Sequence, residues 1–138
     1  MKKPKIPVQK LKEFEIGLVY LFGSQALDTE IPLSDIDVGI VFSNPHVLRN
    51  PKQLQKNYSE LYDIFAETYS PTFKKELDIV FLQQTGISFQ FNVITEGRML
   101  YEATSEFRAN YEGKVINEYL DFEPVIRYFN QVFLERLG

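Results

Sequence analysis

The chain has 138 residues, of which 44% are hydrophobic, 14% aromatic and 25% charged. This composition excludes a disordered or fibrous chain and is typical of one compact domain, which we expect to cover residues 1–138. The net charge of −4 gives little general attraction to nucleic acid, and the lack of cysteine excludes disulfides and thiolate metal sites.

The amino-terminal segment and the hydropathy pattern indicate a cytoplasmic protein. Residues 1–7 are basic, but no apolar stretch of signal-peptide length follows them. No part of the chain approaches the roughly 20 apolar residues that span a bilayer. We therefore expect a cytoplasmic protein that binds neither a membrane nor bulk nucleic acid.

The first half of the chain alternates apolar runs with polar segments. A brief helix is predicted over Val8–Glu15, followed by a buried strand, Ile16–Phe22, that ends at Gly23. After a polar loop, a second strand covers Asp35–Phe42, with side chains alternating between two faces. Apolar residues at helical spacing then predict an amphipathic helix over Lys52–Tyr69.

The second half of the chain combines one more strand with helices. Leu77–Leu82 is a strand-length apolar run interrupted by a single acid. Apolar residues at helical spacing predict a helix over Ile87–Tyr101, and another helix is expected to begin after Ser105. Pro124 is expected to open a last helix over about 124–137, because proline suits the first turn of a helix.

These elements predict an α/β (α+β) domain with a small mixed β-sheet and helices packed on one face. The core is expected to cover about residues 16–124, followed by the C-terminal helix. The acidic residues would lie at an open edge of the sheet. We therefore expect a shallow site, which suits a hydroxyl acceptor carried by another molecule.

Three strands each bring an unusual feature to one of their ends. Gly23 and Ser24 follow the first strand, Asp35 and Asp37 open the second, and Asp78 interrupts the third. Two carboxylates at positions i and i+2 share one face of a strand, where their repulsion disfavours ionisation of both unless a cation lies between them. Oxygen ligands that are open to solvent suit Mg²⁺, and three acids are enough for two ions.

Such a site can transfer the α-phosphate of a nucleoside triphosphate to a hydroxyl. Gly23 would let the backbone approach a phosphate, and the Ser24 hydroxyl would hold the β- and γ-phosphates with nearby amides. Asp35 and Asp37 would ligate metal, and Asp78 would complete the metal site and accept the proton of the incoming hydroxyl. The alternative interpretation of each feature alone is a turn or a capping acid; their combination favours the site.

Two short motifs carry a family resemblance. Gly23-Ser-Gln-Ala26 followed by Ser34-Asp-Ile-Asp-Val38 resembles, in sequence and spacing, the Gly-Ser-x-Ala plus Ser-Asp-x-Asp signature of DNA polymerase β-like nucleotidyltransferases. The small size, the third acid and the segments 94–101 and 112–124 more specifically resemble minimal nucleotidyltransferase (MNT) antitoxins. The likeness covers about residues 16–124.

The resemblance implies a substrate, cofactors and a partner. Members of that family transfer AMP from ATP to a tyrosine of a HEPN-type RNase toxin, so ATP, Mg²⁺ and a HEPN toxin are expected here. Leu27-Asp28 stand where members often have Arg-Gly, a departure that bears on triphosphate affinity. A stand-alone transferase for a small molecule such as an aminoglycoside, and an antitoxin that acts by binding alone, stay open as alternatives.

Overall fold

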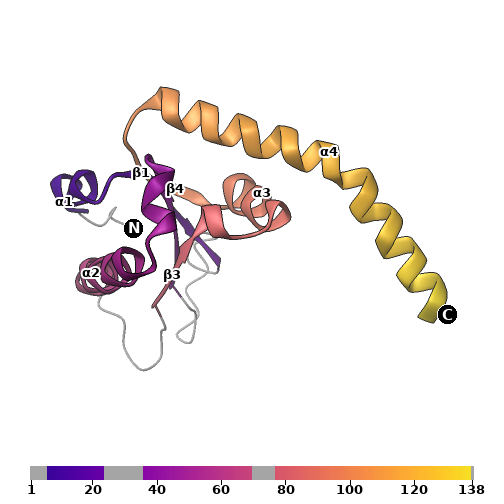
Figure 1. Ribbon diagram of the computed structural model, residues 1–138, viewed down its shortest axis with the longest axis horizontal. Helices are drawn as coiled ribbons and strands as arrows, with labels where there is room; N and C mark the ends of the chain where they lie inside the picture. The colour runs from indigo at the N-terminus through magenta and orange to yellow at the C-terminus, as the bar shows by residue number, and fades with distance from the viewer. Residues whose placement is uncertain (1–5, 24–35, 70–76, 138) are drawn as a thin grey trace.

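The computed structural model describes residues 6–23, 36–69 and 77–137. Within these ranges, one mixed sheet is flanked by helices, and a long C-terminal helix extends away from it (Figure 1). The elements in chain order are α1 (Val8–Glu13), β1 (Ile16–Phe22), β2 (Ile36–Phe42), η2 (Pro45–Arg49), α2 (Pro51–Tyr69), β3 (Leu77–Phe81), η3 (Leu82–Gln84), α3 (Ile87–Glu96), β4 (Arg98–Glu102) and α4 (Ser105–Leu137).

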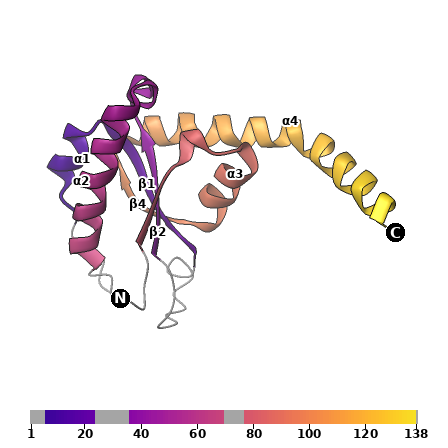
Figure 2. The same ribbon diagram turned by 60° about the horizontal axis from the view of Figure 1, so that its bottom comes forward.

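The strands of the sheet have the order β3-β2-β1-β4. β1 is antiparallel to both of its neighbours, whereas β2 and β3 run parallel. The small mixed sheet predicted from the sequence is confirmed, and so are its three apolar strands. β2 and β3 start where β1 ends, so the ends of these three strands meet at one edge of the sheet (Figure 2).

The helix that we predicted over Ile87–Tyr101 is wrong in its last part, where the structure has a fourth strand, β4. That helix ends at Glu96, and the chain then pairs with β1 from Leu21↔Arg98 to Leu18↔Glu102. A Cβ at Gly97 would clash with the backbone oxygen of Val93 and would lie tightly against that of Leu21. The glycine thus lets the chain turn from α3 directly into an edge strand, which pairs the otherwise open side of β1.

Helices α1 and α2 cover one face of the sheet. α2 is amphipathic, as its spacing predicted, and it starts after Asn50, whose side chain accepts a hydrogen bond from the Gln53 amide at 3.2 Å. The side chains that it buries pack against one face of the sheet. On this face lie Val19 and Leu21 of β1 and the even-numbered residues of β2. The fully buried members of this core include Leu11, Val19, Val38, Ile40, Phe42, Leu61 and Phe65.

Helices α3 and α4 cover the opposite face, which differs from the single helical face that we expected. Figures 1 and 2 show α3 and the first part of α4 on the side of the sheet away from α2. The physical reason is that the strands are apolar on both faces, so each face needs a cover. The buried residues of this second core are Leu18, Tyr20, Val41, Leu82 and Val93.

Two tyrosine hydroxyls attach α4 to the sheet and to α3. Tyr20 of β1 donates a hydrogen bond to Glu112 at 2.7 Å, and Tyr111 donates one to Gln90 of α3 at the same distance. Burial and the neighbouring Glu112 carboxylate raise the pKa of Tyr20, so its hydroxyl stays protonated as a donor. These contacts fix the first part of α4.

One continuous helix occupies the C-terminal region where we expected two. α4 runs through Pro124, and Figure 1 shows that it bends partway along its length. A proline inside a helix removes one backbone hydrogen bond and typically causes a kink. The neighbours of Pro124 are largely exposed, so water can satisfy the carbonyl that it leaves unbonded. Of the described helices, none combines the length and the apolar character needed to cross a membrane.

Candidate active site

The shared edge of β1, β2 and β3 places three of the predicted site residues on adjacent strands. Phe22, the last residue of β1, pairs with Asp37 of β2, and Asp37 pairs in turn with Asp78 of β3. Gly23 follows Phe22 directly. Because neighbouring strands lie about 4.8 Å apart, Gly23, Asp37 and Asp78 form a continuous row across the edge of the sheet.

Asp37 and Asp78 project from the same face of the sheet. Their chain neighbours on both strands, among them Val38 and Ile79, pack into the core beneath α2, so the alternation of a strand directs both acids to the opposite face. Asp37 is half-buried, whereas Asp78 is exposed. The row therefore has one carboxylate set against the protein and one open to solvent.

Gly23 is in direct contact with the half-buried acid. Its φ of +79° lies in the left-handed region, which favours glycine. A Cβ at this position would also collide with Oδ2 of Asp37. Glycine thus suits this position in two ways, because it permits the left-handed turn after β1 and leaves room for the close approach of the backbone to the carboxylate.

Two further predicted residues, Ser24 and Asp35, lie outside the described residues, as does the Leu27-Asp28 pair. Their predicted roles in phosphate and metal binding stay predictions. Asp37 and Asp78 are the predicted acids that the structure brings together.

The carboxylate pair fits a divalent metal. Within residues 6–23, 36–69 and 77–137, no group of three or more histidine, aspartate or glutamate side chains is placed to hold a metal ion. Two carboxylates on one face of the sheet edge, one of them exposed, nevertheless match the oxygen ligands that Mg²⁺ takes while it keeps water or phosphate ligands. Asp35 is predicted to supply a third carboxylate.

The outer side of the site borders α2. Tyr58 of α2 packs edge-on against Phe81 of β3, with 6.2 Å between the ring centroids. Burial raises the pKa of the Tyr58 hydroxyl, and the nearby Asp78 carboxylate raises it further. A neutral hydroxyl thus lies within electrostatic range of the exposed acid.

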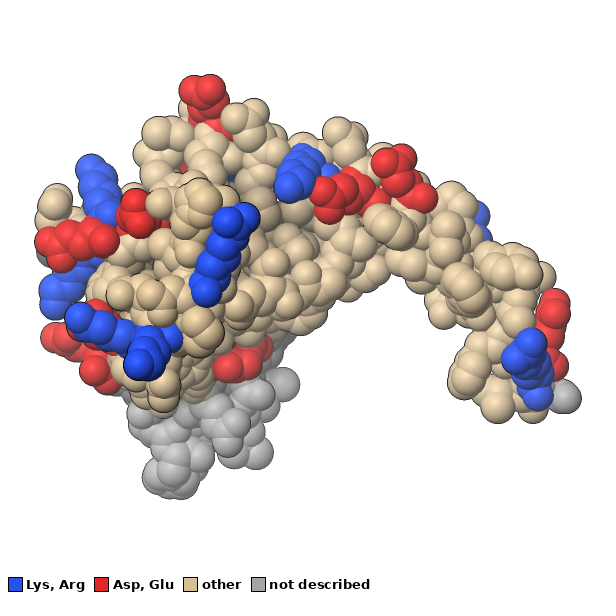
Figure 3. All heavy atoms as spheres, in the orientation of Figure 1, with Lys and Arg blue, Asp and Glu red and all other residues tan. Residues whose placement is uncertain are grey.

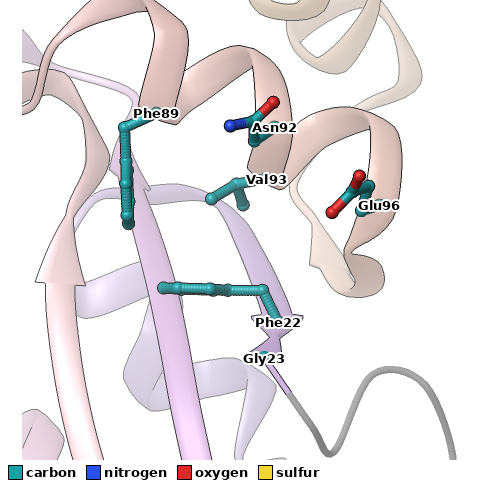
Figure 4. A pocket seen from close by; sticks show the side chains of 6 residues that line it. All are labelled: Phe22, Gly23, Phe89, Asn92, Val93 and Glu96. Carbon is teal, nitrogen blue, oxygen red and sulfur yellow. The ribbon is translucent and has the colours of Figure 1, made fainter. Parts of the chain in front are cut away.

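On its other side, the row opens into a pocket beneath α3. The pocket has a volume of about 210 Å³ and includes Gly23 in its wall. The rings of Phe22 and Phe89 meet edge to face, with centroids 5.6 Å apart and planes at 86° (Figure 4). Its other lining residues, all on α3, are Asn92, Val93 and Glu96.

Sequence reasoning missed this pocket. The helix is rotated so that it buries Gln90 and Val93, of which only Val93 is apolar. That rotation directs Phe89 toward the end of β1. The hydrogen bond from Tyr111 to Gln90 stabilises this orientation, and a buried glutamine cannot be recognised from apolar spacing.

The sheet order, the row of acids and the glycine turn together define a nucleotidyltransferase fold. The family model described as "Polymerase beta, Nucleotidyltransferase" matches residues 7–106 of the chain. The chain belongs to this family. No curated protein sequence matches it.

Solved structures of toxin–antitoxin complexes share the fold. A chain from a toxin–antitoxin structure with AMP-PNP superposes with a TM-score of 0.67 at 18% identity, over 92% of this chain and 94% of that one. A chain from the structure of a tri-AMPylated Shewanella oneidensis HEPN toxin in complex with MNT antitoxin gives 0.63 at 17% identity, over 92% of each chain. An MntA-HepT toxin–antitoxin structure gives 0.58 at 19% identity, again over 92% of each.

Proposed function

We propose that this protein is a Mg²⁺-dependent adenylyltransferase that acts as the antitoxin of a HEPN toxin, transferring AMP from ATP to a toxin tyrosine. The observation that carries the proposal is the row of Gly23, Asp37 and Asp78 at the sheet edge of a chain from the nucleotidyltransferase family. The neighbours with AMP-PNP and with an AMPylated toxin support the choice of nucleotide and acceptor.

Each residue of the row has a role in the transfer. Asp37 and Asp78 would hold Mg²⁺ together with Asp35, whose role is predicted from the sequence. The ion, when bound, neutralises phosphate charge and polarises the reacting oxygens. The left-handed turn at Gly23 brings the backbone next to this charge, and the predicted Ser24 would hold the terminal phosphates. The attacking hydroxyl oxygen forms a bond to the α-phosphorus, the bond to pyrophosphate breaks, and pyrophosphate leaves.

The exposed Asp78 suits the proton transfer. A general base must lie within hydrogen-bond reach of the attacking hydroxyl, and the acceptor arrives from outside the protein. Asp78 is the acid of the pair that faces solvent, on the edge strand β3. It would accept the proton of the acceptor tyrosine, while the half-buried Asp37 would serve as a metal ligand.

The distal part of α4, residues 116–137, provides a surface for the toxin. It exposes a run of large apolar side chains, and on the face that Figure 3 shows, the middle of α4 carries few charged side chains. The shared 92% coverage leaves fewer residues unmatched than this segment contains, so the structural likeness to antitoxins in toxin complexes extends into it. The most exposed of these side chains are Tyr128, Phe129, Phe133, Leu134 and Leu137.

Incubation with α-labelled ATP, Mg²⁺ and the HEPN product of a neighbouring gene tests the proposal. We expect label on the toxin, no label with Asp37→Asn combined with Asp78→Asn, and full labelling with the matched control Asp63→Asn, which alters an exposed acid on α2. No label with the wild-type protein, together with undiminished neutralisation of the toxin by the double variant, would instead identify an antitoxin that acts by binding alone.

A further inference from the structure

The pocket beneath α3 has apolar walls and a polar rim, and the transfer chemistry proposed for the row of acids does not involve it. We propose that it binds the nucleobase of the substrate, and that it selects a purine with an exocyclic amino group, namely adenine. This inference rests on the proposed transferase function. It assigns a binding site to the nucleobase, for which the sequence contains no motif.

The position of the pocket connects it to the phosphate site. Gly23 lines the pocket and also touches the Asp37 carboxylate, so one residue separates the two spaces. A nucleotide with its α-phosphate at the metal-binding acids can therefore place its base on the far side of Gly23, in the pocket.

The walls of the pocket suit a flat aromatic ring. Phe22 and Phe89 present two ring surfaces at right angles, and Val93 lies between them beneath α3 (Figure 4). Phe89 is 40% exposed, although a large apolar side chain gains free energy when it is covered. A base stacked on Phe89 with its edge toward Phe22 would cover this ring.

The polar rim of the pocket supplies the selectivity. The Asn92 amide offers one donor and one acceptor, and the Glu96 carboxylate offers only acceptors. Both side chains are exposed, and they project from α3 at successive turns on the pocket side (Figure 4). Adenine presents an amino group beside ring-nitrogen acceptors, a pattern that asparagine can bind through two hydrogen bonds and that a carboxylate can join as a second acceptor. Hypoxanthine has the same shape but carries an oxygen in place of the amino group.

Binding of three ligands by the isolated chain tests the base pocket. We would measure the affinities for ATP, inosine triphosphate and inorganic tripolyphosphate by calorimetry with Mg²⁺ present. ATP should bind at least about 10-fold more tightly than tripolyphosphate, as expected for one stacked base. Inosine triphosphate should bind more weakly than ATP, because its oxygen faces the Glu96 carboxylate.

Substitutions in the pocket separate the base from the phosphates. Phe89→Ala should weaken ATP binding about 10-fold and leave tripolyphosphate binding unchanged. The matched control is Phe133→Ala, which removes an exposed ring from distal α4 and should leave the ATP affinity unchanged. Asn92→Ala with Glu96→Gln alters only exposed side chains, and it should remove the preference for ATP over inosine triphosphate. Circular dichroism and the thermal midpoint check that each variant is folded.

The outcomes distinguish the base pocket from the transferase function. If Phe89→Ala and the Asn92→Ala, Glu96→Gln variant bind ATP as the wild type does, the base lies elsewhere and the base-pocket proposal fails, while labelling of the toxin still supports the transferase. If wild-type protein binds ATP no more tightly than tripolyphosphate, the base pocket fails in the same way. If it binds neither ligand, both proposals fail.

Discussion

The α/β body, residues 6–115, and the distal part of α4 are both rich in large apolar side chains. The body buries or half-buries most of those that the structure describes, whereas distal α4 exposes most of its own. Phe65 in the body is fully buried, whereas Phe133 in distal α4 is 63% exposed. The one residue that α4 buries is Val115. The body therefore completes its own core, whereas the apolar surface of distal α4 is left for contact with another molecule.

This difference separates two tasks within one short chain. The sheet edge that carries Asp37 and Asp78 is held by both cores, so its geometry depends on the packing of the body. Distal α4 contributes little to that packing. Loss of a body side chain should therefore affect stability or chemistry, and loss of a distal α4 side chain should affect association.

The largest effect on stability should come from a matched pair of phenylalanine substitutions. Phe65→Ala leaves a cavity beneath the sheet and should lower the free energy of unfolding by about 3–5 kcal/mol. Phe133→Ala should change it by less than about 0.5 kcal/mol, because its ring is exposed already. Urea denaturation followed by circular dichroism measures both. Equal losses for the two variants would contradict the comparison.

Substitution of Asp37 should give the largest effect on chemistry. Asp37→Asn keeps the shape of the side chain but removes the charge that would hold Mg²⁺ beside Gly23. The rate of AMP transfer should fall by more than about 100-fold, since even residues behind a metal ligand cost 10–100-fold. Rates of labelling at saturating toxin measure this, with Asp63→Asn as the control. A fall of less than about 10-fold would remove Asp37 from the metal site.

Distal α4 should show the converse behaviour. Phe129→Ser combined with Phe133→Ser removes two exposed rings and should weaken toxin binding by about 30-fold, the effect expected of one binding hot spot. The unfolding free energy and the ATP affinity of the isolated chain should stay unchanged. Calorimetric titration of the variant with the toxin gives the affinity. Undiminished binding would place the toxin on another surface.

Sequence reasoning found the parts of the body that follow a simple period. The alternation in β2 predicted that Asp37 and Val41 share one face, opposite Val38 and Phe42, and the structure has this arrangement. Helix α2 followed from apolar residues three and four apart. The prediction for β2 succeeds because the backbone of a strand sends alternate residues to opposite faces, and the prediction for α2 succeeds because a helix with one buried face repeats its apolar residues three and four apart.

The remaining features depend on contacts between distant residues, which no local period encodes. β4 forms because it pairs with the free edge of β1, although its residues also fit the helical spacing that precedes them. The inward orientation of Gln90 depends on Tyr111, 21 residues away. The continuity of α4 through Pro124 overrides a local preference for a helix start.

The smallest expected effect is a change in stability at alkaline pH, which should distinguish the body from distal α4. Burial raises the pKa of Tyr69 in α2 to about 12, partly offset by the Arg98 guanidinium, against an ordinary value of 10.0. The unfolded chain therefore loses this proton at lower pH than the folded one, so the stabilisation is complete below pH 10 and is lost as the pH rises through 12.

Tyr69→Phe should remove this part of the alkaline loss of stability. At pH 7 it should change the free energy of unfolding by less than about 0.5 kcal/mol, because the Tyr69 hydroxyl is buried and makes no hydrogen bond within the described part of the chain. Tyr128→Phe, on exposed distal α4, should leave the whole pH profile unchanged. Urea midpoints between pH 8 and about 11.5 measure both variants. A profile that Tyr128→Phe alters as much as Tyr69→Phe would mean that distal α4 is packed in solution, and the contrast between the two regions would fail.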